Sequence, residues 1–423
     1  MKTLKALMTV AVAVELIGIL TARADEAETK QEFIEAKQQT ELLGGVAHPS
    51  REDLLTMRKG SYILRARGGK LTKVPAEKNK LPHDPKARVQ DVSVVRAANG
   101  SIYVKQRTIM CKSTDGGRTW SSYKLPGEEE SSQLSLTVYG WPGGEYHLWQ
   151  ILSDGTFISV GGGAWGKRSD PLPVRVSKDQ GRSWQEISDI KLPPQYNERY
   201  PYHMYRLPDD TLLCGIGCRD HTSGVATLNV YHSSNGGKTW QGPSKVIGWS
   251  SEGGIVQVAS GKLLAVCRYQ RPLLPTDPPD LLERTGGRKY PYKHVFLADS
   301  TDGGKSWTDW RQLTTVFGQC RGYPAALSDG TVVVIHDNRT TLGPPGSPGS
   351  RAMVSHDEGK TWEDEVYYLD YSAWGGSYNA SVVLEDDLIL TIDGTTDRGS
   401  GWSAAIGHAD MTAIRWRLAD TND

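Results

Sequence analysis

Two charged residues stand near the two ends of one short apolar segment. The segment Ser251–Arg268 has Glu252 at its start, Arg268 at its end and the turn signal Ser260-Gly261 in the middle. Apolar runs on both sides of such a turn predict an antiparallel hairpin. A hairpin brings its ends together, so a carboxylate and a guanidinium are expected at one rim of the fold. They can serve there as a structural ion pair or as part of a functional site.

Two further residues carry groups that can do chemistry. Tyr378 lies in the stretch Ser377–Ser381, which opens another expected hairpin, and Arg351 lies just ahead of a recurrent octet. A guanidinium binds a carboxylate through two parallel hydrogen bonds, which lysine cannot copy. Arg339 is a rival of Arg351 for this role. The structural alternatives are a tyrosine packed in the core and an arginine on an exposed loop.

The hairpin that carries Glu252 belongs to a set of six. In each copy an apolar run, a tight Asp/Asn-Gly-type turn and a second apolar run follow one another. A strand pair that returns along the whole chain indicates a repeat architecture built from β-sheets. The six copies are Val94–Val104, Gln150–Val160, Tyr205–Ile216, Val256–Val266, Ala326–His336 and Val382–Ile392.

A second repeat, of the form Ser-x-Asp-x-Gly-x-x-Trp, follows each of the first five hairpins. Asp or Asn accepts hydrogen bonds from the backbone ahead of it, Gly takes a left-handed conformation without steric cost, and Trp covers the turn. The octets therefore predict turns that join the third and fourth strands of each unit, and they are not expected to do chemistry. The five copies are Ser113–Trp120, Ser177–Trp184, Ser233–Trp240 (with Asn235 in the Asp place), Ser300–Trp307 and Ser355–Trp362.

The octets have the form of the Asp box, or BNR repeat, and over residues 60–417 the chain resembles the sialidase (neuraminidase) superfamily. The resemblance implies an all-β fold: a six-bladed β-propeller of four-stranded antiparallel blades with Asp-box turns. Closure into a ring protects the strand edges. We expect Ser61–Arg67 to supply the outer strand that closes the ring with the last blade.

The resemblance also implies roles for individual residues. Tyr378 stands in the place of the family's nucleophile, and Glu252 in that of the carboxylate that deprotonates it. A neutral phenol avoids the repulsion that an anionic nucleophile would meet from the carboxylate of a sialic acid. Arg268 and Arg351 match two arginines that hold the sugar carboxylate, and Arg88 is the candidate for the third.

Two parts of the family pattern are poorly matched. Aligned on the turn that follows, Gln90 falls in the place of the first arginine, and Arg88 fits only with a small shift. The acid/base aspartate has no counterpart between the first hairpin and its octet. Asp91, Asp170 and Asp220 remain open as substitutes from other loops.

The implied function is a retaining exo-glycosidase that hydrolyses terminal sialic acid, or a related acidic sugar, from glycans. This mechanism requires no metal and no cofactor. A glycosidase or lyase for another acidic polysaccharide is one alternative. A non-catalytic propeller that binds glycans or proteins is the other.

Charge and the first residues bear on partners and location. Lys+Arg and Asp+Glu are both 49, so no basic excess argues for nucleic acid. Residues 1–24 have the pattern of a secretory signal, with Lys2 and Lys5, the apolar stretch Ala6–Leu20 and a small-x-small cleavage site. An N-terminal anchor is the alternative, although the stretch is short for a bilayer. We therefore expect a secreted or periplasmic protein with no stable membrane insertion after cleavage.

The remaining segments complete the domain assignment. Residues 25–58 are charged and are expected to form a partly helical N-terminal extension, with a helix over Glu26–Leu43 and another capped near Ser50. Residues 59–423 are assigned to the propeller. Cys214 and Cys218 lie about 13 Å apart on a predicted strand, too far for a disulfide, so buried apolar cysteines are expected.

Overall fold

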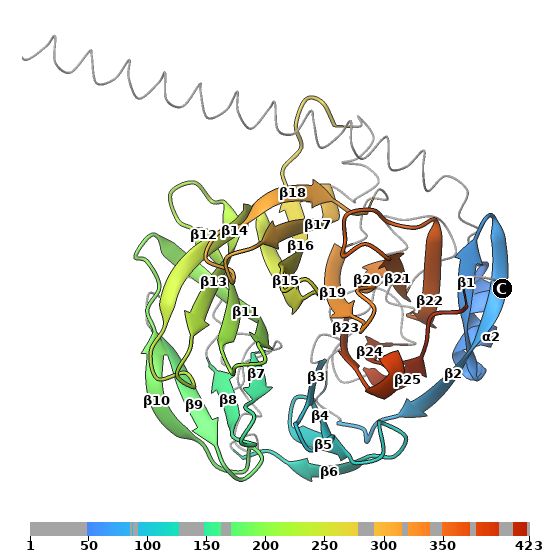
Figure 1. The fold of residues 1–423 in the computed structure, drawn as a ribbon, viewed down its shortest axis with the longest axis horizontal. Helices are drawn as coiled ribbons and strands as arrows, with labels where there is room; N and C mark the ends of the chain where they lie inside the picture. The colour runs from blue at the N-terminus through green and yellow to red at the C-terminus, as the bar shows by residue number, and fades with distance from the viewer. Residues whose placement is uncertain are drawn as a thin grey trace, which may run out of the picture.

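The computed structural model describes residues 49–84, 87, 92–126, 148–161, 171–277, 292–314, 320–338, 349–372, 378–396 and 409–420. Strands dominate this part of the chain, and their sheets stand around a central axis (Figure 1). The inner strands β3, β7, β11, β15, β19 and β23 contact one another in sequence, and β23 contacts β3. The ring is thereby closed, and the fold is an all-β propeller of six blades.

The first four blades are separate antiparallel sheets, each with its four strands in chain order. Blade one comprises β3 (Ser93–Arg96), β4 (Ile102–Lys105), β5 (Ile109–Ser113) and β6 (Ser121–Lys124). Blade two comprises β7 (Trp149–Ile151), β8 (Phe157–Val160), β9 (Leu172–Ser177) and β10 (Gln185–Ile190). Blade three comprises β11 (Tyr196–Arg206), β12 (Leu212–Asp220), β13 (Ala226–Ser233) and β14 (Gln241–Gly248). Blade four comprises β15 (Ser250–Gln257), β16 (Leu263–Arg271), β17 (Tyr292–Ser300) and β18 (Thr308–Gln312).

The last two blades are joined into one nine-stranded sheet of order β19-β20-β21-β22-β1-β2-β25-β24-β23. Blade five comprises β19 (Cys320–Ala326), β20 (Val332–Asn338), β21 (Gly349–Ser355) and β22 (Glu365–Tyr371). Blade six comprises β23 (Tyr378–Val383), β24 (Ile389–Thr395), β25 (Asp410–Trp416) and β2 (Lys70–Lys80). The 3-10 turn η1 (Glu385–Asp387) joins β23 to β24.

The closing strand is not the one expected from the sequence. β1 (Tyr62–Arg67) pairs with β22 of blade five, and β2 instead pairs with β25 as the outer strand of blade six. The cause is the tight turn at Gly68 and Gly69, both with positive φ, which folds β2 back against β1. β2 carries many charged residues, and so its sequence lacks the apolar pattern that marks β1 as a strand.

All five octets form turns between the third and fourth strands of their blades. In the first, the Ser113 hydroxyl donates to Asp115 Oδ1 at 2.8 Å and accepts from the backbone N–H of Gly117 at 2.8 Å. The Asp115 carboxylate also accepts from the backbone N–H of Thr119 at 3.0 Å. Gly117 has φ +86, which favours glycine at this position. Asp115 is therefore a turn residue, as its sequence pattern predicts.

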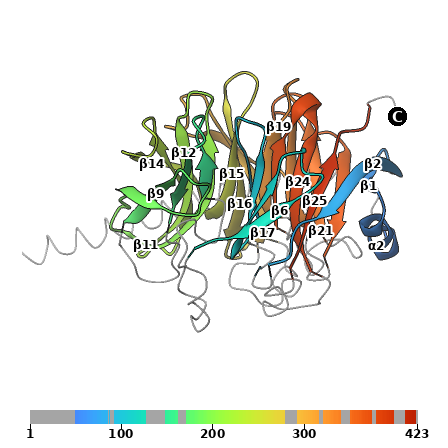
Figure 2. The same ribbon diagram turned by 90° about the horizontal axis from the view of Figure 1, so that it is seen from below.

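Helix α2 (Arg51–Lys59) lies beside β1 and β2 at the edge of the propeller (Figure 2). Ser50 caps it through a capping box with Asp53, and Leu54 and Met57 are buried against blade five. The expected signal segment 1–24 and the expected helix Glu26–Leu43 lie outside the described residues. Within the described ranges, no helix is long and apolar enough to span a membrane.

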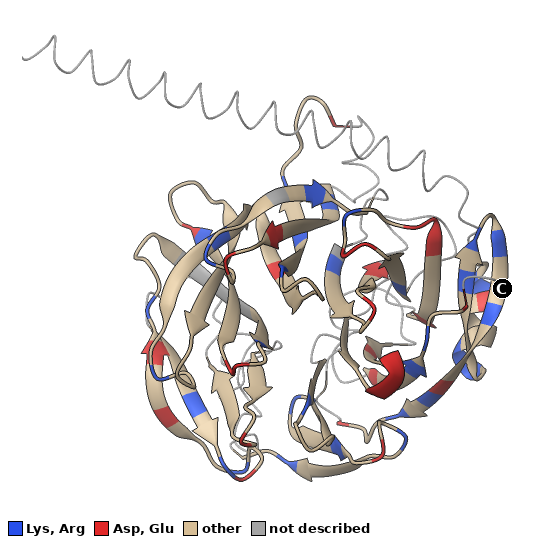
Figure 3. Cartoon of the chain, in the orientation of Figure 1, with Lys and Arg blue, Asp and Glu red and all other residues tan. Residues whose placement is uncertain are grey.

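Apolar layers between neighbouring blades form the core. Val266 of blade four, for example, packs in one cluster with Val334 and Met353 of blade five. The cysteines that the structure describes in full, Cys111, Cys214, Cys218 and Cys267, are buried in such layers, as expected. Charged residues of both signs are distributed around the ring (Figure 3).

Candidate active site

Three candidate side chains lie at the starts of the inner strands of three consecutive blades. Glu252 lies at the start of β15, Arg321 at the start of β19 and Tyr378 at the start of β23. Glu252 falls in a register shift between Ser250 and Gly253 in the pairing of β15 with β16. Such bulges redirect a side chain and occur often beside active sites.

Arg321 is placed by a bulge of the same kind. Cys320 pairs with Asp337 and Gly322 with His336, which leaves Arg321 as the extra residue. Its φ is +57, an uncommon conformation for a residue with a side chain.

Gly322, the next residue, permits close packing of blades four and five. A Cβ atom there would lie 2.3 Å from Cγ1 of Val266 and 3.0 Å from Cγ1 of Val334. Any larger residue would therefore push the start of β19 away from blade four.

The Glu252 carboxylate lies between two guanidinium groups. Arg268 Nη1 donates to Glu252 Oε1 at 2.7 Å, and Arg321 Nε lies 3.8 Å from Glu252 Oε2. Arg268 Nη2 also donates to Gln270 Oε1 at 2.6 Å, which fixes its orientation. Glu252 and Arg321 are both buried. The hairpin thus brings Glu252 and Arg268 to one rim, and the next blade adds a second cation.

Tyr378 meets the same arginine from the other side. The guanidinium carbon of Arg321 lies 4.1 Å from the centroid of the Tyr378 ring, and Nη1 donates to the carbonyl oxygen of Asn379 at 3.4 Å. Tyr378 is only 3% exposed and packs in an apolar cluster with Val94 and Ile392. Arg321 therefore connects Glu252 of blade four to Tyr378 of blade six.

Arg351 lies in the layer between blades four and five. Residues two apart on a strand point to the same face of the sheet, so Arg351 shares a face of β21 with Met353, and Arg268 shares a face of β16 with Val266. Met353 and Val266 belong to one apolar cluster between the two blades. Arg351 and Arg268 therefore enter the same layer.

The Arg351 side chain is a buried cation with few partners. Its Nε and Nη1 atoms are buried without a hydrogen-bond partner among the described residues. Its guanidinium carbon lies 5.3 Å from the centroid of the Tyr368 ring. Burial lowers the pKa of Arg351, and the neighbouring Tyr368 opposes this shift. An anionic group at this point would relieve the cost of burying the charge.

Asp220 is the one described candidate for the acid/base residue. Its Oδ1 accepts from the backbone N–H groups of Thr222 and Ser223, each at 2.8 Å. These bonds, that of Ser223 first, lower the pKa of Asp220 below its ordinary value. A carboxyl group held in this way shapes its turn and is poorly suited to donate a proton near neutral pH.

The other sequence candidates, Arg88, Gln90, Asp91, Asp170 and Arg339, lie outside the described residues. Within the described ranges, no group of three or more His, Cys, Asp or Glu residues could hold a metal ion.

Arg321 was missed by sequence reasoning, although a signal for it exists. Glu252, Arg321 and Tyr378 each stand nine residues before the second turn residue of their hairpin, which is Gly261, Gly330 and Asp387 respectively. Counting back from each turn would have placed the arginine beside the other two. The family resemblance instead places the blade-five arginine between the hairpin and its octet, which is the position of Arg351.

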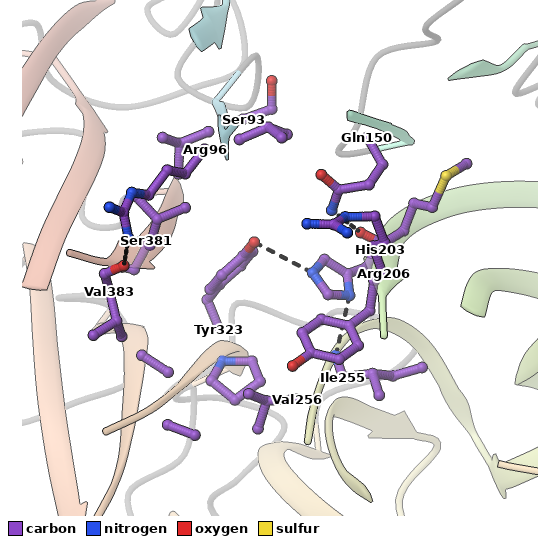
Figure 4. A pocket seen from close by; sticks show the side chains of 18 of the residues that line it. Ser93, Arg96, Gln150, His203, Arg206, Ile255, Val256, Tyr323, Ser381 and Val383 are labelled. Atoms are coloured by element: carbon purple, nitrogen blue, oxygen red, sulfur yellow. Dashed lines mark hydrogen bonds between the residues drawn. The ribbon is translucent and has the colours of Figure 1, made fainter. Parts of the chain in front are cut away.

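A separate cavity of about 250 Å³ lies on the propeller axis. Residues of all six inner strands line it, near the hairpin turns and therefore at the opposite ends of the strands from Glu252 and Tyr378 (Figure 4). At its wall, His203 Nε2 lies 3.2 Å from the Tyr323 hydroxyl, and His203 Nδ1 accepts from the backbone N–H of Ile255 at 3.1 Å. Burial, assisted by Arg321, lowers the pKa of His203 to about 3, so this imidazole is neutral. Both ring nitrogens of His203 have hydrogen-bond partners. The candidate catalytic residues lie outside this cavity.

Closure of six antiparallel blades with octet turns defines the class of protein as a six-bladed BNR-type propeller. Residues 159–392, more than half of the sequence, match the family model of the BNR repeat-like domain, and the chain belongs to this family. No curated protein sequence matches the chain.

Several solved structures share the fold. A protein of unknown function from Dyadobacter fermentans is 18% identical, with a TM-score of 0.55 over 81% of this chain and 98% of that chain. An α-L-arabinofuranosidase from Fusarium graminearum is 15% identical, with a TM-score of 0.56 over 82% and 99%. A Hadza microbial sialidase is 17% identical, with a TM-score of 0.55 over 84% and 73%. Relatives of this fold thus include glycoside hydrolases of more than one specificity.

Proposed function

We propose that this protein is a retaining exo-glycosidase that removes terminal sialic acid, or a related acidic sugar, from glycans. One observation carries the proposal: the carboxylate of Glu252 and the ring of Tyr378 meet at the guanidinium of Arg321, at the starts of inner strands. A carboxylate beside a phenol is the pair needed to activate a tyrosine nucleophile.

The proposed reaction begins with the phenol. The Tyr378 proton passes to the Glu252 carboxylate while the phenol oxygen forms a bond to the anomeric carbon and the glycosidic bond breaks. The departing oxygen takes a proton from a general acid. Water then hydrolyses the glycosyl-enzyme, so the configuration at the anomeric carbon is retained.

The arginines support an acidic substrate. Arg268 and Arg351 enter one layer between blades, and the buried Nε and Nη1 of Arg351 have no partner in the described part of the chain. A sugar carboxylate would supply the hydrogen-bond acceptors that this guanidinium lacks. Arg88 is proposed as the third carboxylate ligand.

A neutral substrate is the nearest competitor. The fold is shared with an arabinofuranosidase whose structure contains arabinobiose, and that sugar has no carboxylate. The concentration of guanidinium groups around Glu252 favours an acidic sugar instead. A glycosidase or lyase of another acidic polysaccharide would use the same cations, and a non-catalytic propeller would bind glycans without turnover.

The test is an assay of the purified protein on three fluorogenic substrates: a sialoside, a glucuronide and an arabinofuranoside. The proposal expects release from the sialoside or the glucuronide, with retention followed by proton NMR of the released sugar. Release from the arabinofuranoside alone would exclude the acidic specificity. Binding of sialylated glycans without release would point to the non-catalytic alternative.

The location is also a proposal. The pattern of residues 1–24 supports export, and a sugar-removing enzyme meets glycans outside the cytoplasm. N-terminal sequencing of protein recovered from the medium or periplasm would test it, with cleavage expected after Ala24.

A further inference from the structure

We propose that Arg321 is a positioning residue that balances charge while a proton passes from the Tyr378 phenol to the Glu252 carboxylate. The inference rests on the proposed function, because it assigns Arg321 a part in the same step. Its basis is the position of one guanidinium between the two reacting groups. Nε of Arg321 lies 3.8 Å from Oε2 of Glu252, and its Cζ lies 4.1 Å from the centre of the Tyr378 ring.

The positive charge of Arg321 has a negatively charged neighbour both before and after the proton transfer. Before transfer, the negative charge is on Glu252. After transfer, Glu252 is neutral and the negative charge develops on the phenol oxygen of Tyr378, whose ring faces the same guanidinium. Because all three side chains are buried, these interactions are stronger than they would be in water. The step therefore moves charge from one neighbour of Arg321 to the other.

Arg268 does not occupy an equivalent position. It lies on the second strand of blade four, and it donates hydrogen bonds to Glu252 at 2.7 Å and to Gln270 at 2.6 Å. Arg268 favours the charge on Glu252 before transfer. Arg321 is the cation that the structure also places against the tyrosine ring.

The backbone supports a role beyond packing. Arg321 has φ +57 and is the extra residue of a bulge, so the chain holds an arginine in a conformation that favours glycine. Strained conformations of this kind persist where the surrounding structure fixes them, and they concentrate at functional sites. Two other titratable groups lie near Arg321. Burial lowers the pKa of His203 on β11 to about 3 and raises the pKa of Tyr323 on β19, so both are neutral near pH 7.

The test measures the phenol itself, without substrate. Tyr378 is replaced by 3,5-difluorotyrosine through amber suppression, and its ionisation is followed by fluorine NMR as the pH is raised. In the Arg321→Gln background we expect the midpoint to rise by at least one pH unit, which is a tenfold weaker acid. Arg321→Lys should give a smaller rise, because the charge stays but an ammonium cannot lie flat on the ring.

A matched control is available on the opposite side of the propeller. The guanidinium carbon of Arg182 lies 4.0 Å from the Tyr123 ring centroid, in the second octet turn, which is nearly the same geometry. Arg182→Gln should leave the midpoint of residue 378 unchanged. If Arg321→Gln does not fold, Arg321→Asn replaces it, since asparagine tolerates positive φ.

The role of Arg321 and the proposed function of the protein are tested by separate measurements. Equal midpoints in the wild-type and Arg321→Gln or Arg321→Asn backgrounds would overturn the role of Arg321, even in an active enzyme. Absence of hydrolysis by the wild-type protein would overturn the proposed function and leave the titration result standing. In an active enzyme, difluorotyrosine at 378 should also restore part of the kcat lost in Arg321→Gln, because a more acidic phenol needs less stabilisation.

Discussion

Arg321 and Tyr378 belong to different blades, yet the guanidinium carbon of the first lies 4.1 Å from the ring centroid of the second. The contact crosses from blade five to blade six at the starts of their inner strands. The same guanidinium reaches Glu252 of blade four, so three blades meet at one cation.

Tyr378→Phe removes only a hydroxyl and keeps the ring packed. If Tyr378 is the nucleophile, kcat on the fluorogenic substrate should fall by orders of magnitude, while the thermal midpoint changes by a few degrees at most. The control is Tyr231→Phe in blade three, because the Tyr231 hydroxyl is buried without a described hydrogen-bond partner. That variant should keep full activity. Full activity of Tyr378→Phe would exclude the phenol as nucleophile.

Arg351→Met should stabilise the protein and weaken substrate binding. It replaces a buried cation, whose Nε and Nη1 lack described partners, by an apolar side chain of similar length. We expect the free energy of unfolding to rise by about 1–4 kcal/mol and KM for an acidic substrate to rise at least tenfold. Urea unfolding and steady-state kinetics measure the two effects.

Arg65, unlike Arg351, is a buried arginine with a carboxylate partner. Its Nε donates to Glu365 Oε1 at 2.6 Å, and both side chains are buried. Arg65→Met should therefore destabilise the protein by about 3–5 kcal/mol, because Glu365 loses a buried partner. A loss of stability in Arg351→Met, together with an unchanged KM, would show that Arg351 is a structural residue like Arg65.

The octet aspartates should contribute stability that depends on pH. Hydrogen bonds from the Ser183 and Ser177 hydroxyls lower the pKa of Asp179 from 3.8 to about 2. A lowered folded-state pKa means that the contribution is complete above the unfolded value and is lost as the pH falls toward 2. Asp179→Asn should therefore lose less stability than wild type between pH 4 and pH 2, as measured by urea unfolding. If the free energy of unfolding fell equally with pH in both proteins, this prediction would be wrong. Asn235, which fills the same place in the third octet, shows that the amide fits the turn.

Helix α2 should depend on a buried ion pair with blade five. Arg58 Nε lies 3.7 Å from Oδ1 of Asp370, a carboxylate that is only 2% exposed. Burial raises the pKa of Asp370, and Arg58 and Lys78 oppose this shift. Arg58→Met should destabilise by about 1–3 kcal/mol, because it leaves the acid with less compensation. Adding Asp370→Asn to that variant should recover part of the loss, and a fully additive second loss would rule out the coupling.

Much of the fold could be predicted because its signals are local. A Gly at 117 and an Asp at 115 shape their turn through atoms within a few residues, so the octet pattern is visible in the sequence. Alternating apolar strands around a tight turn are equally local. The number of blades follows from counting these units. The role of β2 as the outer strand of blade six was not predicted, because its pairing partner β25 lies more than 300 residues away in the sequence.

The candidate site divides in the same way. The pairing of Glu252 with Arg268 follows from one hairpin, and the sequence alone predicted that they share a rim. That Tyr378 and Glu252 share Arg321 depends on ring closure, because no local contact connects the starts of β15, β19 and β23. The direction of the Arg321 side chain depends further on a bulge and on the close packing that Gly322 permits. Sequence determined the repeated turns and strands, whose interactions span few residues, while the tertiary structure decided which side chains meet, because those contacts form only when the blades pack.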